Sequence, residues 1–375
     1  MRILLSCPYA WDAPGGVQVH VGELGARLRA RGHDVRVLTP SRAAPRQPWV
    51  RAVGRPIAIP YNRSVAPICF SPASARRVAA ELRAFVPDVV HAHEPLAPST
   101  SMFAVRAGAA EGTPIVATFH AGAERSRLFD IAAPGLRRIA RSIDVRVAVS
   151  AAAARFASRR IGEGFVIVPN GVDVERFAGA EPAELPAGRR MLFVGRLDER
   201  KGFRVAVAAF ERLTGRFPDL LLVAVGDGPE AAAARALPES IRSRIVLVGR
   251  VANEDLHGYE AAADVFVAPS VGGETFGVVL VEAMAAGVPV VASDIPGYDE
   301  VIREGEGLLV PPRDPAALAA AVARILDDPS AARALGDAGR TRARSYSWES
   351  VADRLEAIYE DVAARGDSGG GRGVR

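Results

Sequence analysis

The feature that most constrains the fold is a regular alternation of short apolar runs with longer stretches rich in Ala, Arg and Glu. A chain in which strands and helices alternate in this way forms a parallel sheet with helices on both faces. In the first half the pattern predicts strands at 2–7, 35–39, 89–93, 115–119, 146–149 and 165–168, with a first helix at 17–31. We therefore expect an α/β fold with a doubly wound sheet.

The same pattern starts again in the second half of the chain. It predicts strands at 191–194, 220–225, 245–248, 265–268, 288–292 and 308–310, and a stretch at 178–190 separates the two sets. Two Rossmann-like units in tandem are expected to face each other across a cleft at the carboxyl ends of their strands. The expected domains are 1–169 with a returning C-terminal helix at about 347–364, and 170–346. The glycine-rich residues 366–375 are expected to form a disordered tail.

Composition narrows the class of protein. Hydrophobic residues make up 49% of the chain and charged residues 24%, which is the balance of a globular protein and not of a disordered one. The two cysteines, Cys7 and Cys69, exclude a disulfide framework and favour a reducing compartment. The N-terminal apolar run stops at Pro8, which is too early for a signal peptide or a membrane span. We therefore expect a cytoplasmic protein.

The net charge of +4 is unevenly distributed along the chain. Residues 1–169 carry 23 arginines against 11 acidic residues, whereas residues 170–375 carry 24 basic and 32 acidic residues. Residues 35–80 hold eight arginines and no acid. A basic half favours an anionic partner, which on charge alone could be a nucleic acid, a membrane surface or a phosphorylated acceptor. Few aromatic residues interleave with these arginines, so nucleic acid is disfavoured.

The segment 269–284 is the strongest functional motif. A predicted strand ends at Ala268, a glycine loop follows, and a helix is expected to begin near Phe276. A helix N-terminus approached through glycines favours phosphate, because free N–H groups and the helix dipole attract anions. Glu274 in the loop and Glu282 two helical turns later suit the hydroxyl groups of a sugar. The alternative is a capped helix with a solvated acidic face.

A second loop follows the predicted strand at 191–194 and offers Arg196 and Lys201 to a phosphate. Lys201 is the only lysine in a chain with 46 arginines. Its compact ammonium group would suit a diphosphate as a point charge. The alternative is a lysine that survives by chance on a loop.

Histidines lie on the predicted strands of the first half. His120 follows the strand at 115–119, where a single histidine is more often structural than catalytic. His91 and His93 place two imidazoles on one strand face, but no third ligand lies at a suitable spacing. No Asp-x-Asp motif lies at a predicted strand end. We therefore expect no metal site and no metal requirement for donor binding.

Residues 72–86 predict an amphipathic helix. Arg76, Arg77 and Arg83 lie off its apolar face, which consists of Ala75, Val78, Ala79, Leu82 and Val86. Such a helix could lie on a membrane surface or pack on the sheet like any other helix. The acid-free stretch around it favours the membrane.

Together these segments resemble glycosyltransferase family 4, the retaining nucleotide-sugar transferases with the two-domain GT-B fold. The resemblance covers about residues 1–362. It is carried by Pro14-Gly15-Gly16-Val17, by 168–173, by Gly195-Arg196 with Lys201-Gly202, and by Glu274 and Glu282 with seven residues between them. Within the family, Cys7-Pro8-Tyr9 and His93-Glu94-Pro95 are similar to segments of transferases that act on phosphatidylinositol. The implied reaction moves mannose from GDP-mannose to the inositol ring with retention.

The resemblance also implies roles for individual residues. The implied catalytic residues are His120, Arg196, Lys201 and Glu274. The implied donor-binding residues are Gly16, Arg196, Lys201, Val251, Glu274, Phe276, Gly277 and Glu282. The implied acceptor-binding residues are Tyr9, Asp12, Gln18, Asn62 and Arg125, with Arg125 where the family usually has a lysine.

The chain departs from the family pattern in two places. The spacing from Arg196 to Lys201 is one residue shorter than in the family pattern, and the helix with Arg76, Arg77 and Arg83 looks less basic than the family's membrane-association helix. That helix implies a peripheral protein on the inner face of the cell membrane. No tightly bound cofactor is implied beyond the donor substrate.

Two alternative functions remain open from the sequence. One is another family 4 transferase that uses UDP-N-acetylglucosamine on a soluble inositol phosphate, and it would need no basic membrane-facing surface. The other is a non-catalytic nucleotide-sugar binding protein, which would tolerate loss of Glu274 or His120, although both are present. Retention normally requires a carboxylate nucleophile, and none is clearly placed. The family resemblance implies front-face attack instead, in which the leaving diphosphate takes the acceptor proton.

Overall fold

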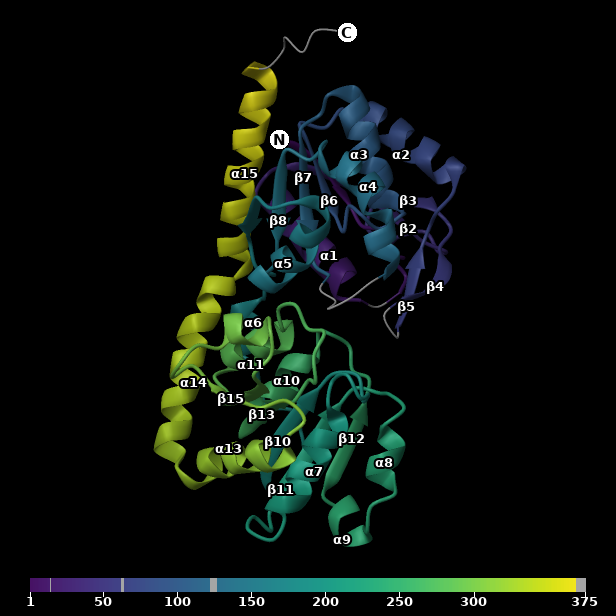
Figure 1. Cartoon of the computed structure of the whole chain (residues 1–375). Coiled ribbons are helices and arrows are strands. Elements are labelled where there is room, and N and C mark those ends of the chain that lie inside the picture. The colour runs from purple at the N-terminus through teal and green to yellow at the C-terminus, as the bar shows by residue number, and fades with distance from the viewer. Residues whose placement is uncertain (14, 62–63, 122–126, 369–375) are drawn as a thin grey trace. The chain divides into compact units, whose positions relative to one another are not determined.

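The computed structural model describes residues 1–13, 15–61, 64–121 and 127–368. The chain divides into two compact units. Unit 1 contains Met1–Gly171 and Trp348–Arg375, and unit 2 contains Val172–Ser347. Figure 1 shows both units, and each is described by itself below.

Unit 1 has, within the described residues, a seven-stranded parallel sheet with the strand order β3-β2-β1-β6-β7-β8-β9. These strands are β1 (Arg2–Ser6), β2 (Asp34–Pro40), β3 (Val50–Gly54), β6 (Val89–His93), β7 (Ile115–Phe119), β8 (Val145–Ala148) and β9 (Phe165–Ile167). The helices of the unit are α1 (Gly16–Ala30), α2 (Pro72–Phe85), α3 (Thr100–Glu111), α4 (Arg127–Ala140), α5 (Ala151–Ile161) and α15 (Trp348–Ser368). A separate antiparallel pair is formed by β4 (Ile57–Tyr61) and β5 (Ser64–Ile68).

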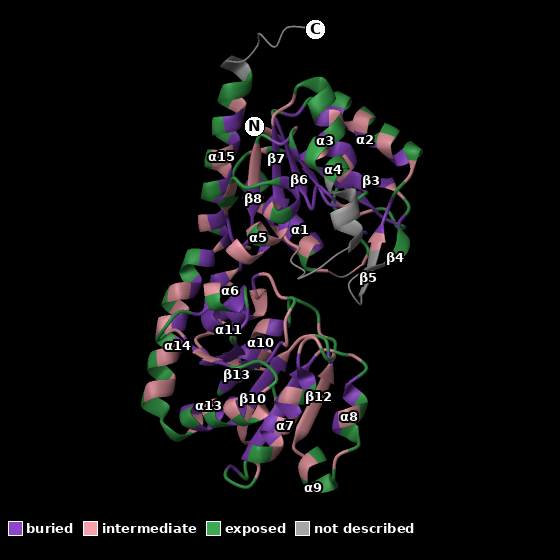
Figure 2. Ribbon diagram, in the orientation of Figure 1, coloured by how far each residue is buried: buried purple, intermediate pink, exposed green. Residues whose placement is uncertain are grey.

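The central strands β1, β6 and β7 of unit 1 are buried on both faces, and Figure 2 shows β6 and β7 in purple. Successive side chains of a strand point to opposite faces, so β1 contributes to two separate cores. Ile3 and Leu5 lie in a cluster with apolar residues of α1 and α15, whereas Leu4 lies in a cluster with residues of α2 and α3. This explains why the strands read as continuous apolar runs.

The last helix belongs to unit 1 although it follows unit 2 in the sequence, which confirms the expected return of the C-terminal helix. Trp348 and Tyr359 of α15 are buried in the same cluster as residues of α1. The guanidinium group of Arg31 donates to Asp353 at 2.6 Å and adds an ion pair at the edge of this contact. The helix continues to Ser368, farther than the predicted end near Ala364.

Unit 2 repeats the architecture, with the strand order β12-β11-β10-β13-β14-β15 in its described sheet. Its strands are β10 (Arg189–Val194), β11 (Leu220–Val225), β12 (Ile245–Gly249), β13 (Val265–Ala268), β14 (Val290–Ser293) and β15 (Leu308–Val310). Its helices are α6 (Val174–Ala178), α7 (Phe203–Leu213), α8 (Ala231–Arg235), α9 (Glu239–Arg242), α10 (Leu256–Ala261), α11 (Val278–Ala286), α12 (Tyr298–Val301), α13 (Pro315–Asp327) and α14 (Pro329–Ala343), followed by the 3-10 turn η1 (Arg344–Tyr346). One core cluster joins its central strands to α7 and α13.

The predicted strands are therefore present in both units, with ends that differ by at most two residues. The sequence analysis missed β3 and the β4–β5 pair, which lie in the arginine-rich stretch. These strands carry polar or proline residues, and they lie at the edge of the sheet or outside it, so they lack the continuous apolar signal of a central strand. No helix in the described part of the chain is long and apolar enough to cross a bilayer.

The junction between Gly171 and α15 yields a test of how the last helix is held. A Cβ atom at Gly171 would overlap the indole ring of Trp348, which is buried. We expect Gly171→Ala to destabilise unit 1 by about 1–3 kcal/mol, since an overpacked core must shift its side chains or backbone. Urea unfolding followed by tryptophan fluorescence measures the effect. Gly215→Ala is the matched control because nothing lies near its added Cβ atom, and equal stability of both variants would contradict this account.

Candidate functional site: a phosphate-type loop, paired carboxylates and buried histidines

A glycine loop in unit 2 joins β13 to α11 at the carboxyl end of the sheet. Gly272, Gly273 and Gly277 have φ values of 145°, 74° and 88°, conformations that favour glycine. A Cβ atom at Gly277 would also overlap the ring of Tyr298. Helix α11 begins at Val278, two residues after the expected start, and no side chain caps it. No side chain therefore competes with an anion for its first N–H groups, which is the arrangement that the predicted phosphate site requires.

Glu274 forms a cluster with two basic residues of the loop after β10. The guanidinium of Arg200 donates to Glu274 Oε1 at 2.5 Å, and Lys201 Nζ lies 3.0 Å from the same oxygen. Burial would raise the pKa of the Glu274 carboxyl, but Lys201 and Arg200 outweigh burial and lower that pKa. The sequence analysis assigned Lys201 and Glu274 separately to phosphate and sugar. The structure brings them into direct contact.

The other predicted donor residues of unit 2 lie in three different environments. Arg196 is largely exposed, with Nε 3.4 Å from Asp198. Val251 follows β12 and is half-buried. Phe276 is buried with its ring against Tyr346, so only its backbone is left to meet a ligand.

Glu282 is buried on α11 and is not part of a solvated acidic face. Burial raises its pKa to about 7. Helices α6, α10 and α11 pack together here and bring Glu260 of α10 close to Glu282. Both carboxylate oxygens of Glu260 are buried without a hydrogen-bond partner in the structure. Burial and the neighbouring Glu282 raise the pKa of Glu260, while Arg176 of α6 partly offsets them.

The loop after β1 in unit 1 carries the predicted acceptor residues. Gln18 is buried and its amide donates to the carbonyl oxygens of Ala10 and Ala13, both at 3.1 Å. Asp12 accepts a hydrogen bond from the backbone N–H of Arg42 at 3.0 Å. These two side chains therefore shape the loop. Around them, Tyr9 is half-buried, and Gly16, the predicted donor glycine of this unit, has open space at its Cα. Asn62 and Arg125 lie outside the described residues.

His120 lies at the carboxyl end of β7, as predicted. Burial lowers its pKa to about 4, so its imidazole is neutral at pH 7. Its Nε2 forms a hydrogen bond of 2.9 Å with Nδ1 of His93. The rings of His20 and His120 lie 4.9 Å apart, edge to face. Three histidines thus meet here, whereas the sequence analysis found only the pair on β6.

Glu94 positions the backbone that carries His120. Its carboxylate accepts hydrogen bonds from the backbone N–H groups of His120 and Ala121. The residue has a φ of 50°, which is uncommon outside glycine and indicates a conformation held by its surroundings. Burial raises the pKa of Glu94 to about 7, although the two N–H donors partly offset this.

Helix α2 packs its apolar face on its own sheet. Val78 and Leu82 are buried in the core of unit 1, so these residues are not available to a bilayer. Val86, which was predicted on the same face, lies beyond the end of the helix and is exposed. Arg76 and Arg77 are exposed, and Arg83 lies 3.5 Å from Glu111, which offsets part of its charge. A membrane role would therefore depend on the exposed arginines and not on an apolar stripe.

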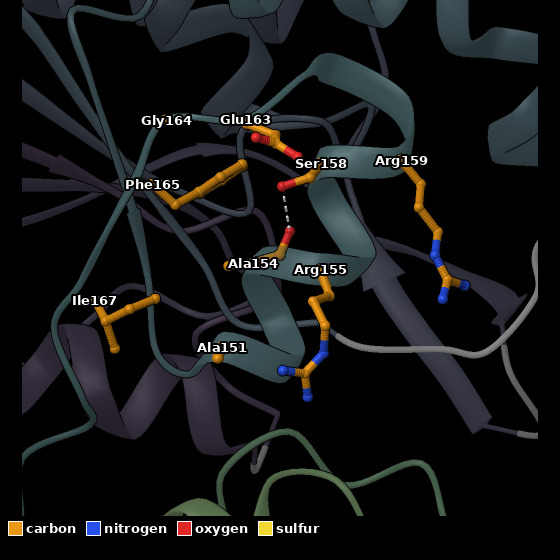
Figure 3. Close-up of a pocket in the computed structure, with 9 residues that line it drawn as sticks. All are labelled: Ala151, Ala154, Arg155, Ser158, Arg159, Glu163, Gly164, Phe165 and Ile167. Atoms are coloured by element: carbon orange, nitrogen blue, oxygen red, sulfur yellow. Dashed lines mark hydrogen bonds between the residues drawn. The ribbon is translucent and has the colours of Figure 1, made fainter.

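A separate cavity of about 500 Å³ lies between α5 and β9 in unit 1 (Figure 3). Its lining consists of Ala151, Ala154, Arg155, Ser158, Arg159, Glu163, Gly164, Phe165 and Ile167. None of the residues predicted from the sequence lines it. The hydroxyl of Ser158 donates to the carbonyl oxygen of Ala154 within the helix, as the dashed line shows. This cavity is not the site that the motifs indicate.

Comparison with known proteins identifies the family. The model described as "Glycosyltransferase Family 4" matches residues 14–176, and "Glycosyl transferases group 1" matches residues 188–328. The phosphatidyl-myo-inositol mannosyltransferase of Mycobacterium leprae is 44% identical over 374 residues, which cover 98% of each chain. The chain belongs to glycosyltransferase family 4. A second relative of the same name, from Mycolicibacterium smegmatis, is 41% identical over 98% of this chain and 95% of its own.

Solved structures agree on the fold of this glycosyltransferase. A sucrose-phosphate synthase from Thermosynechococcus elongatus is similar with a TM-score of 0.74 and 25% identity, over 97% of this chain and 99% of that one. The expected α/β fold with two Rossmann-like units of the GT-B type is therefore confirmed.

Four polar residues of the two sites escaped the functional analysis of the sequence: Arg200, Glu260, His20 and Glu94. Arg200 stands next to Lys201, and Glu94 stands at a strand end inside a motif that had been noted, so their positions gave a usable signal. Glu260 lies on a helix with no motif around it, and His20 lies just beyond the Pro14–Val17 motif, whose pattern does not include it. Only the packing of α10 on α11 and of α1 near β6 and β7 reveals them.

The buried Glu260 gives the stability of unit 2 a specific dependence on pH. A carboxyl whose pKa is raised by folding binds protons more tightly in the folded state, so its effect on stability becomes unfavourable as pH rises above the unfolded value of about 4.3. Glu260→Gln removes that charge and nearly keeps the shape. We expect the variant to be more stable than wild type by about 1–3 kcal/mol at pH 8 and nearly equal to it at pH 4.

Urea unfolding of wild type and variant at both pH values measures this difference. Glu239→Gln serves as the control because Glu239 is exposed on α9. If Glu260→Gln were less stable than wild type at pH 8, the prediction would be wrong. The attraction between Arg176 and the Glu260 carboxylate would then fully offset the cost of burying that charge.

Proposed function

We propose that this glycosyltransferase moves mannose from GDP-mannose to the myo-inositol ring of phosphatidylinositol, with retention, at an anionic membrane surface. The observation that carries the proposal is the 44% identity to a phosphatidyl-myo-inositol mannosyltransferase along essentially the whole of both chains. The glycogen synthase of Mycobacterium tuberculosis is also similar over 98% of this chain, but at 32% identity. The inositol-lipid relatives are therefore favoured over a polysaccharide-extending one.

The geometry of unit 2 supports a diphosphate-bearing donor. The loop before α11 presents backbone N–H groups, and Lys201 and Arg200 lie beside it, fixed by Glu274. Because the pKa of Glu274 is lowered, its carboxylate stays ionised at neutral pH and holds both cations in place before the substrate arrives. Cations held in advance stabilise charge that develops on a leaving diphosphate without a cost of reorganisation at that moment. Arg196 adds an exposed guanidinium to the same loop.

The described residues offer no obvious carboxylate nucleophile in this region. Glu274 is paired with two cations, and Glu282 is buried with a raised pKa. Both features suit binding better than attack on an anomeric carbon. This supports front-face transfer, in which the leaving diphosphate accepts the proton of the acceptor hydroxyl, and the chain's part is to bind, orient and stabilise charge.

The first experiment tests donor and acceptor together. The full chain is incubated with labelled GDP-mannose, UDP-glucose and UDP-N-acetylglucosamine, each with and without phosphatidylinositol and with EDTA present. We expect transfer only from GDP-mannose to the lipid, and no loss with EDTA, because cationic side chains take the place of a metal. Lys201→Ala should lower kcat/KM roughly ten- to a hundred-fold, the loss of one charge-assisted contact of about 1.5–3 kcal/mol.

Three results would contradict parts of this proposal. Transfer from UDP-N-acetylglucosamine to a soluble inositol phosphate would replace the function by its nearest alternative. A requirement for Mg²⁺ after EDTA treatment would contradict the assignment of the cationic side chains. An unchanged rate in Lys201→Ala would show that the single lysine is incidental.

The second experiment tests the membrane surface. Each basic residue near an anionic leaflet contributes about 1 kcal/mol, and salt screens the attraction over a Debye length of ~10 Å at 0.1 M. Changing Arg76, Arg77 and Arg83 together to serine should reduce co-sedimentation with phosphatidylinositol vesicles several-fold at low salt and leave donor affinity nearly unchanged. The contribution of Arg83 should be the smallest, because Glu111 already faces it.

A matched control removes the same charge elsewhere. Arg212, Arg235 and Arg333 are exposed residues of unit 2, and their triple serine variant should bind vesicles like wild type. Equal loss in both triple variants would show that vesicle binding follows net charge and not α2. A parallel fall in donor affinity would indicate misfolding of the α2 variant, and temperature-dependent circular dichroism would detect it.

A further inference from the structure

Three histidines from distant parts of unit 1 converge on one point. His20 lies on α1, His93 ends β6, and His120 follows β7. Each offers one ring nitrogen such that the three nitrogens lie within 4.8 Å of one another. All three side chains come from regular elements or directly follow one, so the arrangement is set by the helix and the parallel strands.

Part of the hydrogen-bonding capacity of this cluster is unused. Nδ1 of His20 and Nε2 of His93 are buried without a partner in the structure. Buried polar atoms are normally hydrogen-bonded, so Nδ1 of His20 in particular calls for an explanation by an ion, a water molecule or a ligand.

The other histidines are engaged or distant. His91 is fully committed, since its ring nitrogens bond to the hydroxyl groups of Tyr359 at 2.6 Å and Thr118 at 2.7 Å. It packs its ring against His93 at 4.2 Å and acts as a support of the cluster. His33 pairs with Glu356 in unit 1, and His257 belongs to unit 2. The cluster therefore has a defined set of three imidazoles.

We propose that His20, His93 and His120 form a binding site for a divalent transition-metal ion of the zinc type. Three imidazoles with an open fourth position are a recognised zinc arrangement, and imidazole is also a good ligand for Cu²⁺, Ni²⁺ and Co²⁺. Tetrahedral Zn–N bonds of about 2.0–2.1 Å place ligand nitrogens roughly 3.3 Å apart. The His93 and His120 nitrogens are already 2.9 Å apart, and all three nitrogens lie within 4.8 Å, so the rings must close in on the ion by up to about 1.5 Å to complete the site.

Coordination requires a move of one proton and no net release. The hydrogen bond between His93 Nδ1 and His120 Nε2 holds one N–H, on one or the other ring. When both nitrogens bind the ion, that proton transfers to the other nitrogen of its own ring. If the proton starts on His93, it moves to Nε2 of His93, which has no partner in the structure. If it starts on His120, it moves to Nδ1 of His120, and the hydrogen bond between the side chains of His120 and Asn170 must adjust.

The site has a consequence for catalysis that rests on the proposed function. His120 is a predicted catalytic residue, so an ion bound to its ring withdraws it from the substrate. The ion is therefore inhibitory and reversible, in contrast to a metal that the reaction needs. This agrees with the expectation that transfer survives EDTA.

Calorimetric titration of the untagged, EDTA-treated full chain with ZnCl₂ tests the site directly. We expect one equivalent of Zn²⁺ to bind to wild type and equally to His257→Gln, the matched control in unit 2. His20→Gln and His93→Gln should each weaken binding at least ten-fold. Equal binding by all four proteins, or no binding by wild type, would overturn the site and leave water as the partner of the unpaired nitrogens.

Two further measurements protect the result against misfolding and separate it from the proposed function. If the histidine variants unfold, Co²⁺ is added to wild type and its visible ligand-field absorption is measured. A site of three imidazoles should give a strong tetrahedral spectrum. Absence of that spectrum would overturn the proposal. In the transfer assay, Zn²⁺ should inhibit and EDTA should restore activity. Zn²⁺ binding without inhibition would keep the site and overturn only its inhibitory role.

Discussion

Burial of the central strands of both parallel sheets on both faces is the constraint on which the rest of the structure depends. In unit 1, Ile3 and Leu5 enter one core while Leu4 enters the other. A polar side chain on such a central strand is therefore buried, and another group must form hydrogen bonds with it. His91 shows the exception, since Tyr359 and Thr118 occupy both of its ring nitrogens. Functional groups must then gather mainly at the carboxyl ends of strands, where the chain leaves the sheet.

The same constraint explains which parts of the fold the sequence reveals. A strand covered on both faces reads as an unbroken apolar run, and for that reason Ile115–Phe119 and Leu220–Val225 were located to the residue. The strand Val50–Gly54 lies at the edge of the sheet, and the pair Ile57–Tyr61 and Ser64–Ile68 lies outside it, so their sequences lack the unbroken apolar run of a central strand. The returning helix was recognised because it lies beyond the last strand of the second unit.

The candidate sites were predictable as far as they depend on neighbours in sequence. Gly277 and Lys201 stand just after strands and could be found from the strand pattern alone. The side chains that pair with these charges could not be predicted from the sequence pattern. Lys201 contacts Glu274, and Glu260 approaches Glu282, only because distant segments fold together. Two glutamates eight residues apart therefore acquire opposite properties, since cations lower the pKa of one and burial raises that of the other.

The single lysine takes on a physical meaning in this setting. Lys201 and Arg200 are adjacent in sequence, and both reach the same oxygen of Glu274, at 3.0 and 2.5 Å. Two planar guanidinium groups would compete for room around one oxygen, whereas an ammonium is a compact point charge with freely rotating donors. The cluster has one more positive than negative charge, and it lies in the loop that leads to the N-terminus of α11, which no side chain caps. The pairing of Lys201 with Glu274 therefore leaves a net positive charge fixed in the loop, which suits an anion.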